Sequence, residues 1–250
     1  MVLVLETHLR KKDVVLVTGF GPFRFHEVNA SWEAVKLLQD YNNDKFSIIT
    51  EQIPVEYQAV DSKLPILWSK LNPKLVVHVG VSHVAEKLTL ETRAHQTGYE
   101  STDVSGKLCE EGKCCTLNDT PDVLETGLDV NDICNKFNTN SKHVQACVSK
   151  NAGRYLCEYI YFKSLSFNNK CTIFIHVPML DQPYTVQQLA DALILIINMV
   201  YDHLYNHNNL LHQEENENIQ QHVSNKTTAD DLIDFNQQNI DIIDITKNTL

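Results

Sequence analysis

The sequence predicts an α/β fold in which helices cover both faces of a mostly parallel sheet. Short apolar runs rich in Val and Ile alternate along the chain with longer segments whose apolar residues recur at helical spacing. This alternation is typical of α/β proteins, in which strands buried on both faces read as continuous apolar runs. With 250 residues, 43% of them hydrophobic, the chain is long enough to bury one sizeable core.

Strand and helix patterns alternate through the first half of the chain. "VVLVTGF" is a continuous β-branched run that ends in glycine-rich turn chemistry, and Asn29 is a candidate N-cap for the helical pattern after it. Pro65 interrupts the second helical pattern, and Asn72–Pro73 precedes the third apolar run. We expect, in order, strand 14–20, helix 29–41, strand 46–53, helix 56–71, strand 74–81 and strand 87–95.

The second half begins with an irregular segment and then resumes the alternation. Residues 96–128 are rich in Gly, Thr, Asp and Cys and are expected to form a long loop excursion. After them we expect a short helix near 130–137, strand 143–149, a helix holding Cys157, strand 171–177 and a last helix from about 185 to 205.

Composition divides the chain into three parts. Residues 1–12 are predicted to be an N-terminal extension and residues 13–205 one domain. In 206–250, 14 of 45 residues are Asn or Gln, glycine and proline are absent, and eight acidic residues face two lysines. Such a composition is typical of a disordered or loosely helical tail.

Charge and hydropathy limit the partners. The formal net charge of −11, with no basic cluster, argues against nucleic acid. The apolar stretch "LADALILIINMV" is too short and too polar for a membrane span, and "MVLVLETHLRKK" has the wrong order for a secretory signal. The seven cysteines are an odd number with no secretory signal before them, so we expect free thiols and a cytoplasmic location. Whether the protein is a monomer or a homo-oligomer stays open.

Three residues are expected to meet at one edge of the sheet. In a parallel sheet the loops that leave the carboxyl ends of the strands gather along one edge, where ligands bind. Cys157 lies on the helix after strand 143–149, His176 ends the next strand, and Glu91 lies a short way beyond strand 74–81. The turn "TGFGPF" leaves the first strand at the same edge.

These three residue types together suit acyl transfer. A helix N-terminus or a neighbouring imidazolium can lower a thiol pKa from about 8.5 to about 3.5–7.5, which produces a nucleophilic thiolate. A histidine within hydrogen-bond reach can supply the counter-charge and protonate a leaving amine, and a carboxylate fixes its tautomer. The structural alternatives are that Cys157 is core, as we expect for Cys147 and Cys171, that His176 is structural and that Glu91 is solvated.

Seven short motifs give the chain a resemblance to a known family. The motifs "VTGFGPF", "NASW", "IPVEYQAV", "VVHVGVS", "LTLE", "NAGRYLC" and "HVP" occur in this order, as in the pyroglutamyl peptidase I family (pyrrolidone-carboxylate peptidases, cysteine peptidase family C15). The resemblance covers about residues 13–205 and looks closest to the animal members, which share the cysteine-bearing excursion. It implies a three-layer α/β/α sandwich similar to that of purine nucleoside phosphorylases.

The resemblance also implies an activity and assigns roles. The implied reaction removes an N-terminal pyroglutamyl residue from small peptides through a thioester on Cys157, without a cofactor or metal. By resemblance, Cys157 is the nucleophile, His176 is the general base and acid, and Glu91 orients the histidine. Phe20 and Phe23 match the phenylalanines that line the lactam pocket in the family.

A pyroglutamate site can also be argued from the ligand. Pyroglutamate is a flat, uncharged lactam with one N–H and one ring carbonyl, so its site needs aromatic faces and backbone hydrogen bonds. The segment "GFGPF" offers Phe20 and Phe23 beside glycines. The alternative for either ring is a role in the core. Asn29 is expected mainly as a helix cap, with a pocket role as the alternative.

Some features depart from the family pattern. Bacterial members usually carry arginine after the glutamate, whereas this chain has Thr92 and then Arg93. The run "CEEGKCC" at 109–115 lacks zinc-finger spacing, so a disordered loop is expected in preference to a metal site. Two other functions are weighed: a non-catalytic pyroglutamate- or peptide-binding protein of the same fold, and a nucleoside phosphorylase, for which no phosphate loop is legible.

Overall fold

The computed structural model describes residues 12–23, 27–114 and 120–224. The chain divides into two units, Met1–Tyr201 and Asp202–Leu250. The named strands all belong to the first unit. Within the described residues, no helix has both the length and the apolar character that crossing a membrane requires.

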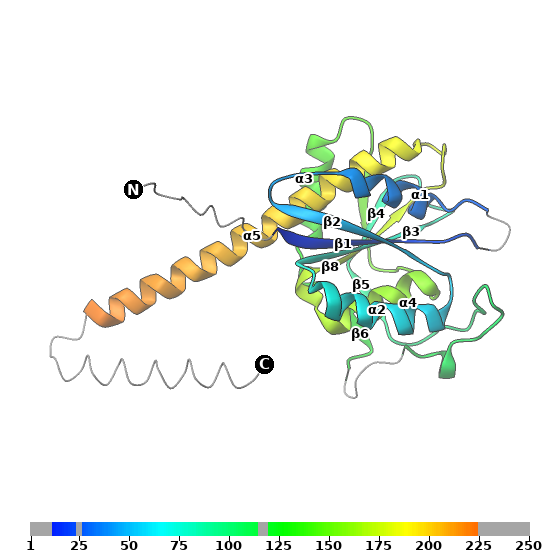
Figure 1. Cartoon of the computed structure of the whole chain (residues 1–250), viewed down its shortest axis with the longest axis horizontal. Helices are drawn as coiled ribbons and strands as arrows, with labels where there is room; N and C mark the ends of the chain where they lie inside the picture. Colours follow the sequence, from blue (N-terminus) through cyan, green and yellow to red (C-terminus); the bar gives the residue numbers. More distant parts are fainter. Residues whose placement is uncertain (1–11, 24–26, 115–119, 225–250) are drawn as a thin grey trace, which may run out of the picture. The chain divides into compact units, whose positions relative to one another are not determined.

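A six-stranded sheet forms the centre of the first unit (Figure 1). Its strands lie in the order β2-β1-β3-β8-β4-β7. Four of them are mutually parallel: β1, Asp13–Phe20; β2, Phe46–Ile53; β3, Leu75–Val81; and β8, Thr172–Val177. The other two, β4 (Leu88–Glu91) and β7 (Ala146–Ser149), are parallel to each other, and β4 pairs antiparallel with β8. The expectation of a mostly parallel sheet is confirmed.

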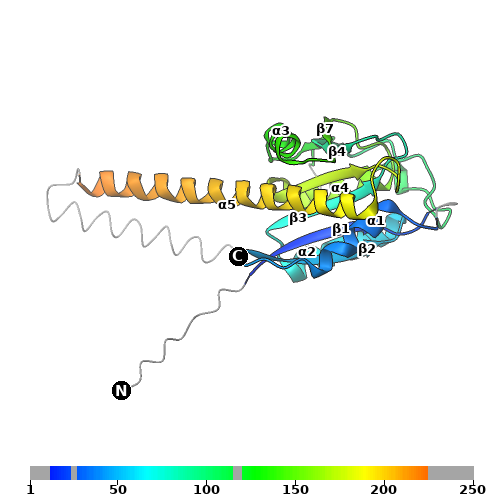
Figure 2. The ribbon, with the colours of Figure 1, turned by 90° about the horizontal axis from the view of Figure 1, so that it is seen from above.

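Helices cover both faces of this sheet. One face carries α1 (Ala30–Lys36), α3 (Val130–Asn140) and the first part of α5 (Val186–Ser224). The opposite face carries α2 (Tyr57–Leu71) and α4 (Leu156–Phe167), which contact each other (Figures 1 and 2). The short elements are the 3-10 helices Leu37–Asp40, Glu110–Gly112 and Asn169–Cys171. The result is a three-layer α/β/α arrangement.

The burial pattern explains why these segments form these elements. The β-branched and Leu residues of β1, β3 and β8 are almost completely buried, because helices pack on both faces of the central strands. At the start of α1, Asn29 accepts a hydrogen bond from the backbone N–H of Ser31 at 3.1 Å, so the predicted N-cap is confirmed.

Two of the expected elements differ in the structure. The strand expected over 87–95 is two strands: β4 belongs to the central sheet, whereas β5 (Arg93–His95) pairs with β6 (Val123–Glu125) in a second, two-stranded sheet. Alternating polarity looks the same whether the segment is one strand or two consecutive strands that belong to different sheets. Pro65 does not interrupt its helix but lies inside α2, where the missing N–H costs one hydrogen bond in a 15-residue helix.

The last helix and the loop excursion also differ. Helix α5 continues past residue 205 to Ser224, into the predicted tail, and residues 225–250 lie outside the described residues. The disordered loop expected at 109–115 is wrong for Cys109 and Cys114. Both are buried among apolar residues of α2 and α4, where a small thiol behaves as a hydrophobic side chain. Cys115 lies outside the described residues.

Candidate active site

Cys157 is the second residue of α4, as expected from the sequence. Tyr155 is the N-cap of this helix, and its side chain makes no capping hydrogen bond. The first backbone N–H groups of a helix lack intrahelical partners and carry partial positive charge. The partly buried thiol lies at this end of the helix, and the helix N-terminus favours negative charge on the sulfur.

His176 and Glu91 meet across two neighbouring strands. In the register of β8 and β4, Glu91 lies opposite Phe174, two residues from His176, so the two side chains share a face of the sheet. His176 Nδ1 and Glu91 Oε1 are 2.9 Å apart and hydrogen-bonded. His176 is 8% exposed and Glu91 only 1%, so water screens this contact poorly.

His176 also interacts with Cys157. Burial alone would lower the pKa of the imidazole, but hydrogen bonds to Cys157 and Glu91 and their charges raise it to about 9. The imidazolium form is thus stabilised by the Cys157 thiolate on one side and the Glu91 carboxylate on the other. The ring of Phe174 lies beside the imidazole, with the two ring centres 4.8 Å apart.

The three side chains line one cavity of about 540 Å³. Its wall also contains Phe20, Phe23 and Tyr155 and the loop residues Ser149, Asn151, Ala152 and Gly153. Among the described lining residues there is no lysine or arginine, and Glu91 is the one carboxylate. The cavity therefore suits a small uncharged group with an aromatic wall on one side.

Residues after β1 shape one side of the cavity. Phe20 N–H donates to Ser31 Oγ at 3.0 Å, and Asn29 Nδ2 donates to the Gly21 carbonyl at 2.9 Å. Ser31 Oγ in turn donates to Asn29 Oδ1. Asn29 thus caps α1 and holds the turn that carries Phe20. The sequence did not point to Ser31, although a serine two residues after an N-cap asparagine can bond back to it.

The route by which Cys157 reaches this edge differs from the expected one. Strand β7, which precedes the cysteine helix, runs antiparallel to β8, because both β7 and β4 are reversed relative to the other four strands. Its carboxyl end therefore does not point the same way as the end of β8. Residues 150–155 instead lead the chain to the start of α4. The structure brings Cys157, His176 and Glu91 together, but the assumed parallel topology is wrong at this strand.

Comparisons with known proteins agree with this arrangement. Residues 13–204 match the family model described as pyroglutamyl peptidase. Pyroglutamyl-peptidase 1 of Homo sapiens is 41% identical over 192 residues, which cover 76% of this chain and 91% of the human protein. The Rattus norvegicus protein of the same name is 42% identical over 187 residues, 74% of this chain and 88% of the rat protein. The chain belongs to the pyroglutamyl peptidase family.

Solved structures of the pyroglutamyl peptidase family have the same fold. The pyrrolidone carboxyl peptidase of Fervidobacterium islandicum superimposes with a TM-score of 0.67 at 26% identity, covering 74% of this chain and 97% of that one. The enzyme from Thermococcus litoralis, at 22% identity, gives a TM-score of 0.70 over 78% of this chain and 96% of that one. The three-layer fold inferred from the family resemblance is therefore confirmed.

This pyroglutamyl peptidase family member departs from the bacterial pattern after Glu91. Thr92 Oγ1 donates to the Ser149 carbonyl at 3.1 Å, and Arg93 Nε donates to the Lys150 carbonyl at 3.2 Å. Thr92 therefore binds the last residue of β7, and Arg93 binds the residue that follows it. Within the described residues, no group of three or more His, Cys, Asp or Glu side chains is arranged to hold a metal ion.

Proposed function

We propose that this protein is a cysteine exopeptidase that hydrolyses the N-terminal pyroglutamyl residue from small peptides through a thioester on Cys157. Family membership supports the reaction and the substrate class. The observation that carries the assignment of roles is the imidazole of His176, which bonds to both Cys157 and Glu91 in the wall of one cavity. No observation favours the non-catalytic alternative.

The first half of the reaction forms the thioester. The Cys157 sulfur attacks the carbonyl carbon that joins pyroglutamate to the next residue, and the carbonyl oxygen becomes an oxyanion. We assign the stabilisation of this charge to the backbone N–H groups at the start of α4, to which the N-cap side chain makes no hydrogen bond. The His176 imidazolium then protonates the leaving nitrogen, the C–N bond breaks, and the shortened peptide departs.

The second half returns the enzyme to its starting state. His176, now neutral, accepts a proton from water, and the resulting hydroxide equivalent attacks the thioester carbonyl. The C–S bond breaks, free pyroglutamate is released, and the thiol–imidazole pair is restored. Throughout, Glu91 holds the proton on Nδ1 and so presents Nε2 to the reacting groups.

The cavity supports pyroglutamate as the acyl group. Phe23 is partly buried and offers an apolar face for a flat lactam, while Phe20, 3% exposed, belongs to the core and backs the same wall of the cavity. A free amino-terminal ammonium would need an accessible carboxylate, whereas Glu91 is 1% exposed and bonded to His176 through Oε1. We therefore assign Phe20 and Phe23 to substrate binding.

We further propose that residues 13–205 form the peptidase domain and that the protein works in a reducing compartment such as the cytoplasm. The described residues that line the cavity all lie before Val177. All described cysteines are free thiols. No cofactor is required by the reaction as written.

Hydrolysis of pyroglutamyl p-nitroanilide tests the proposal. Wild-type protein should release nitroaniline, iodoacetamide should abolish the release, and a chelator should leave it unchanged. Cys157→Ala should remove essentially all turnover with an unchanged unfolding temperature. The expectation that Cys147 lies in the core is wrong, because its thiol is exposed on β7; Cys147→Ser is therefore the matched control and should stay active. Turnover by Cys157→Ala would reject the assignment of Cys157 as the nucleophile. If the wild type binds pyroglutamate tightly but is inactive, the non-catalytic binding protein would be favoured.

A further inference from the structure

Glu158 is a completely buried carboxylate on the residue next to Cys157. Successive side chains of a helix point about 100° apart, so Glu158 and Cys157 face different parts of the molecule. Burial raises the pKa of Glu158, whereas bonds to His95 and Arg154 lower it. A buried carboxylate of this kind persists only when partners compensate its desolvation.

Both oxygens of Glu158 are engaged. Oε1 accepts hydrogen bonds from the backbone N–H of His95 at 3.3 Å and from its Nδ1 at 2.8 Å. Oε2 accepts from Arg154 Nη1 at 2.7 Å. Glu158 therefore links the start of α4 to strand β5, which begins two residues after Glu91, and to the arginine in front of the helix.

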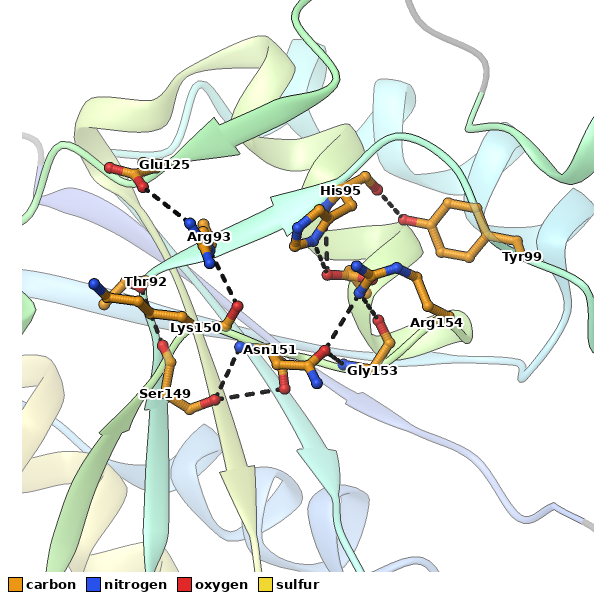
Figure 3. Close-up of polar contacts among 11 residues, drawn as sticks. Thr92, Arg93, His95, Tyr99, Glu125, Ser149, Lys150, Asn151, Gly153 and Arg154 are labelled. Carbon is orange, nitrogen blue, oxygen red and sulfur yellow. Dashed lines mark hydrogen bonds and ion pairs between the residues drawn. The ribbon is translucent and has the colours of Figure 1, made fainter.

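Arg154 transmits this link to the wall of the cavity. Figure 3 shows its guanidinium directed at the turn formed by Asn151 and Gly153. Arg154 Nη1 donates to the Gly153 carbonyl at 2.8 Å and to Asn151 Oδ1 at 3.3 Å, while Gly153 N–H donates to the same oxygen at 3.2 Å. Asn151 and Gly153 line the cavity beside Cys157.

A glycine beside Arg154 leaves space for its side chain, and further hydrogen bonds join the residues after Glu91 to those before Cys157. A Cβ at Gly98 would lie 3.0 Å from Arg154 Cδ, and Gly98 has a positive φ of 100°, so only glycine fits there without strain. The hydroxyl of Tyr99 donates to the His95 carbonyl (Figure 3). Thr92 and Arg93 bind the carbonyls of Ser149 and Lys150, so the whole stretch after Glu91 is tied to the stretch before Cys157.

We propose that Glu158 is a positioning residue for the reaction: its carboxylate holds Arg154 against Asn151 and Gly153 and so fixes the cavity wall against which the acyl group rests. This inference rests on the proposed function. Orientation of bound reactants to within about an ångström has large effects on rate, so a loosened wall lowers the reactive fraction of bound substrate. The hydrogen bonds of Glu158 go to His95 and Arg154 and not to the Cys157 thiol or the His176 imidazole, so we expect the alkylation of Cys157 to change much less than turnover.

Two measurements on the full chain test this. The first is kcat and KM for pyroglutamyl p-nitroanilide. The second is the rate of iodoacetamide alkylation of Cys157 against pH, followed by mass spectrometry of the peptide that carries it. Glu158→Gln should lower kcat/KM about tenfold, mainly in kcat, while the alkylation profile stays that of the wild type. A change confined to the unfolding temperature, or an altered alkylation profile, would overturn the proposal.

Further variants keep the test decisive if Glu158→Gln folds poorly. Arg154→Met leaves Glu158 with its two hydrogen bonds from His95 and should show the same tenfold loss when it is assayed well below its own unfolding temperature. The double variant should lose no more than either single one, because both break the same link. Full additivity would contradict the mechanism.

The control is a similar ion pair elsewhere. Asp132 and Lys136 on α3 form an exposed i,i+4 pair at 2.7 Å that does not line the cavity. Asp132→Asn should leave kcat/KM unchanged. If the wild type itself releases no nitroaniline, the proposed function falls and this inference with it. If the wild type is active and Glu158→Gln equals it, the positioning role alone is wrong.

Discussion

Gly80 on β3 lies in contact with Cys157 on α4: a Cβ added at residue 80 would be 2.7 Å from the Cys157 sulfur and 2.8 Å from Cζ of Phe174. Gly80 is also paired with His176 in the register of β3 and β8. The backbone of β3 therefore forms the floor on which the thiol and the imidazole approach each other.

Gly80→Ala should reduce kcat/KM by at least about 100-fold, because the methyl group must displace the thiol or the Phe174 ring. The first shift moves the sulfur from His176, and the second moves the ring that packs beside the imidazole. Assays of pyroglutamyl p-nitroanilide and of the alkylation rate check this. Gly127→Ala is the control, since a Cβ there meets its nearest atom at an ordinary 3.4 Å. Activity close to wild type in Gly80→Ala would show that the thiol position is not constrained as described.

Glu91→Gln should change the pH dependence of the reaction. His176 has a pKa raised to about 9, partly by the Glu91 carboxylate, and the imidazolium is the form that protonates the leaving amine. Activity should therefore fall as pH rises through about 9. Removing the carboxylate charge lowers the pKa of His176, so in Glu91→Gln the fall should begin at lower pH, with kcat reduced roughly 100-fold.

The measurement is a profile of kcat/KM between pH 6 and 10, a range set by the unperturbed and raised pKa values of histidine. An alkaline limb at the same pH in both proteins would mean that Glu91 does not stabilise the imidazolium. Unfolding temperatures of both proteins at pH 7 serve as the control for folding.

Phe23→Ala should weaken substrate binding with a smaller effect on the chemistry. Phe23 lines the cavity, and loss of one aromatic face is worth about 0.5–1.5 kcal/mol, which is roughly a two- to tenfold rise in KM. Phe167→Ala is the matched control, because Phe167 is 44% exposed and its ring packs on Trp68. An unchanged KM in Phe23→Ala would mean that the lactam does not bind against the Phe23 ring.

His78 should make the fold sensitive to acid. It is completely buried on β3, bonded to Thr18 Oγ1 at 2.7 Å, and burial lowers its pKa to about 3. Between pH 6.5 and about 3 the unfolded chain binds a proton here that the folded chain does not, so the free energy of unfolding falls as pH falls. The slope from this one group reaches about 1.4 kcal/mol per pH unit.

His78→Asn should remove that slope while lowering stability at pH 7, because the amide keeps a polar group near Thr18 but leaves a gap. Urea unfolding at several pH values between 4 and 7 measures it, within the interval set by the two pKa values. His143→Asn, at an exposed histidine, is the control. Equal slopes in His78→Asn and wild type would assign the acid sensitivity to other groups.

Much of the fold could be predicted because its signals are local. The β-branched runs of β1, β3 and β8 read as buried strands, Asn29 is an N-cap, and Cys157 lies near the start of a helix. The strand at 87–95 could not be resolved into β4 and β5, because alternation describes which face a residue takes and not which sheet it joins. The reversed direction of β4 and β7 was equally invisible, since strand direction depends on a partner distant in sequence.

The sequence by itself determined the elements, the residue types available for acyl transfer and, through its motifs, the family. Only the tertiary structure decided that His176 is hydrogen-bonded to Glu91 on the antiparallel strand β4, that Gly80 lies against the Cys157 thiol, and that Glu158 binds Arg154. Hydrophobic periodicity and capping act over a few residues and are therefore legible along the chain. Close packing and the pairing of buried charges act between segments that meet only after folding.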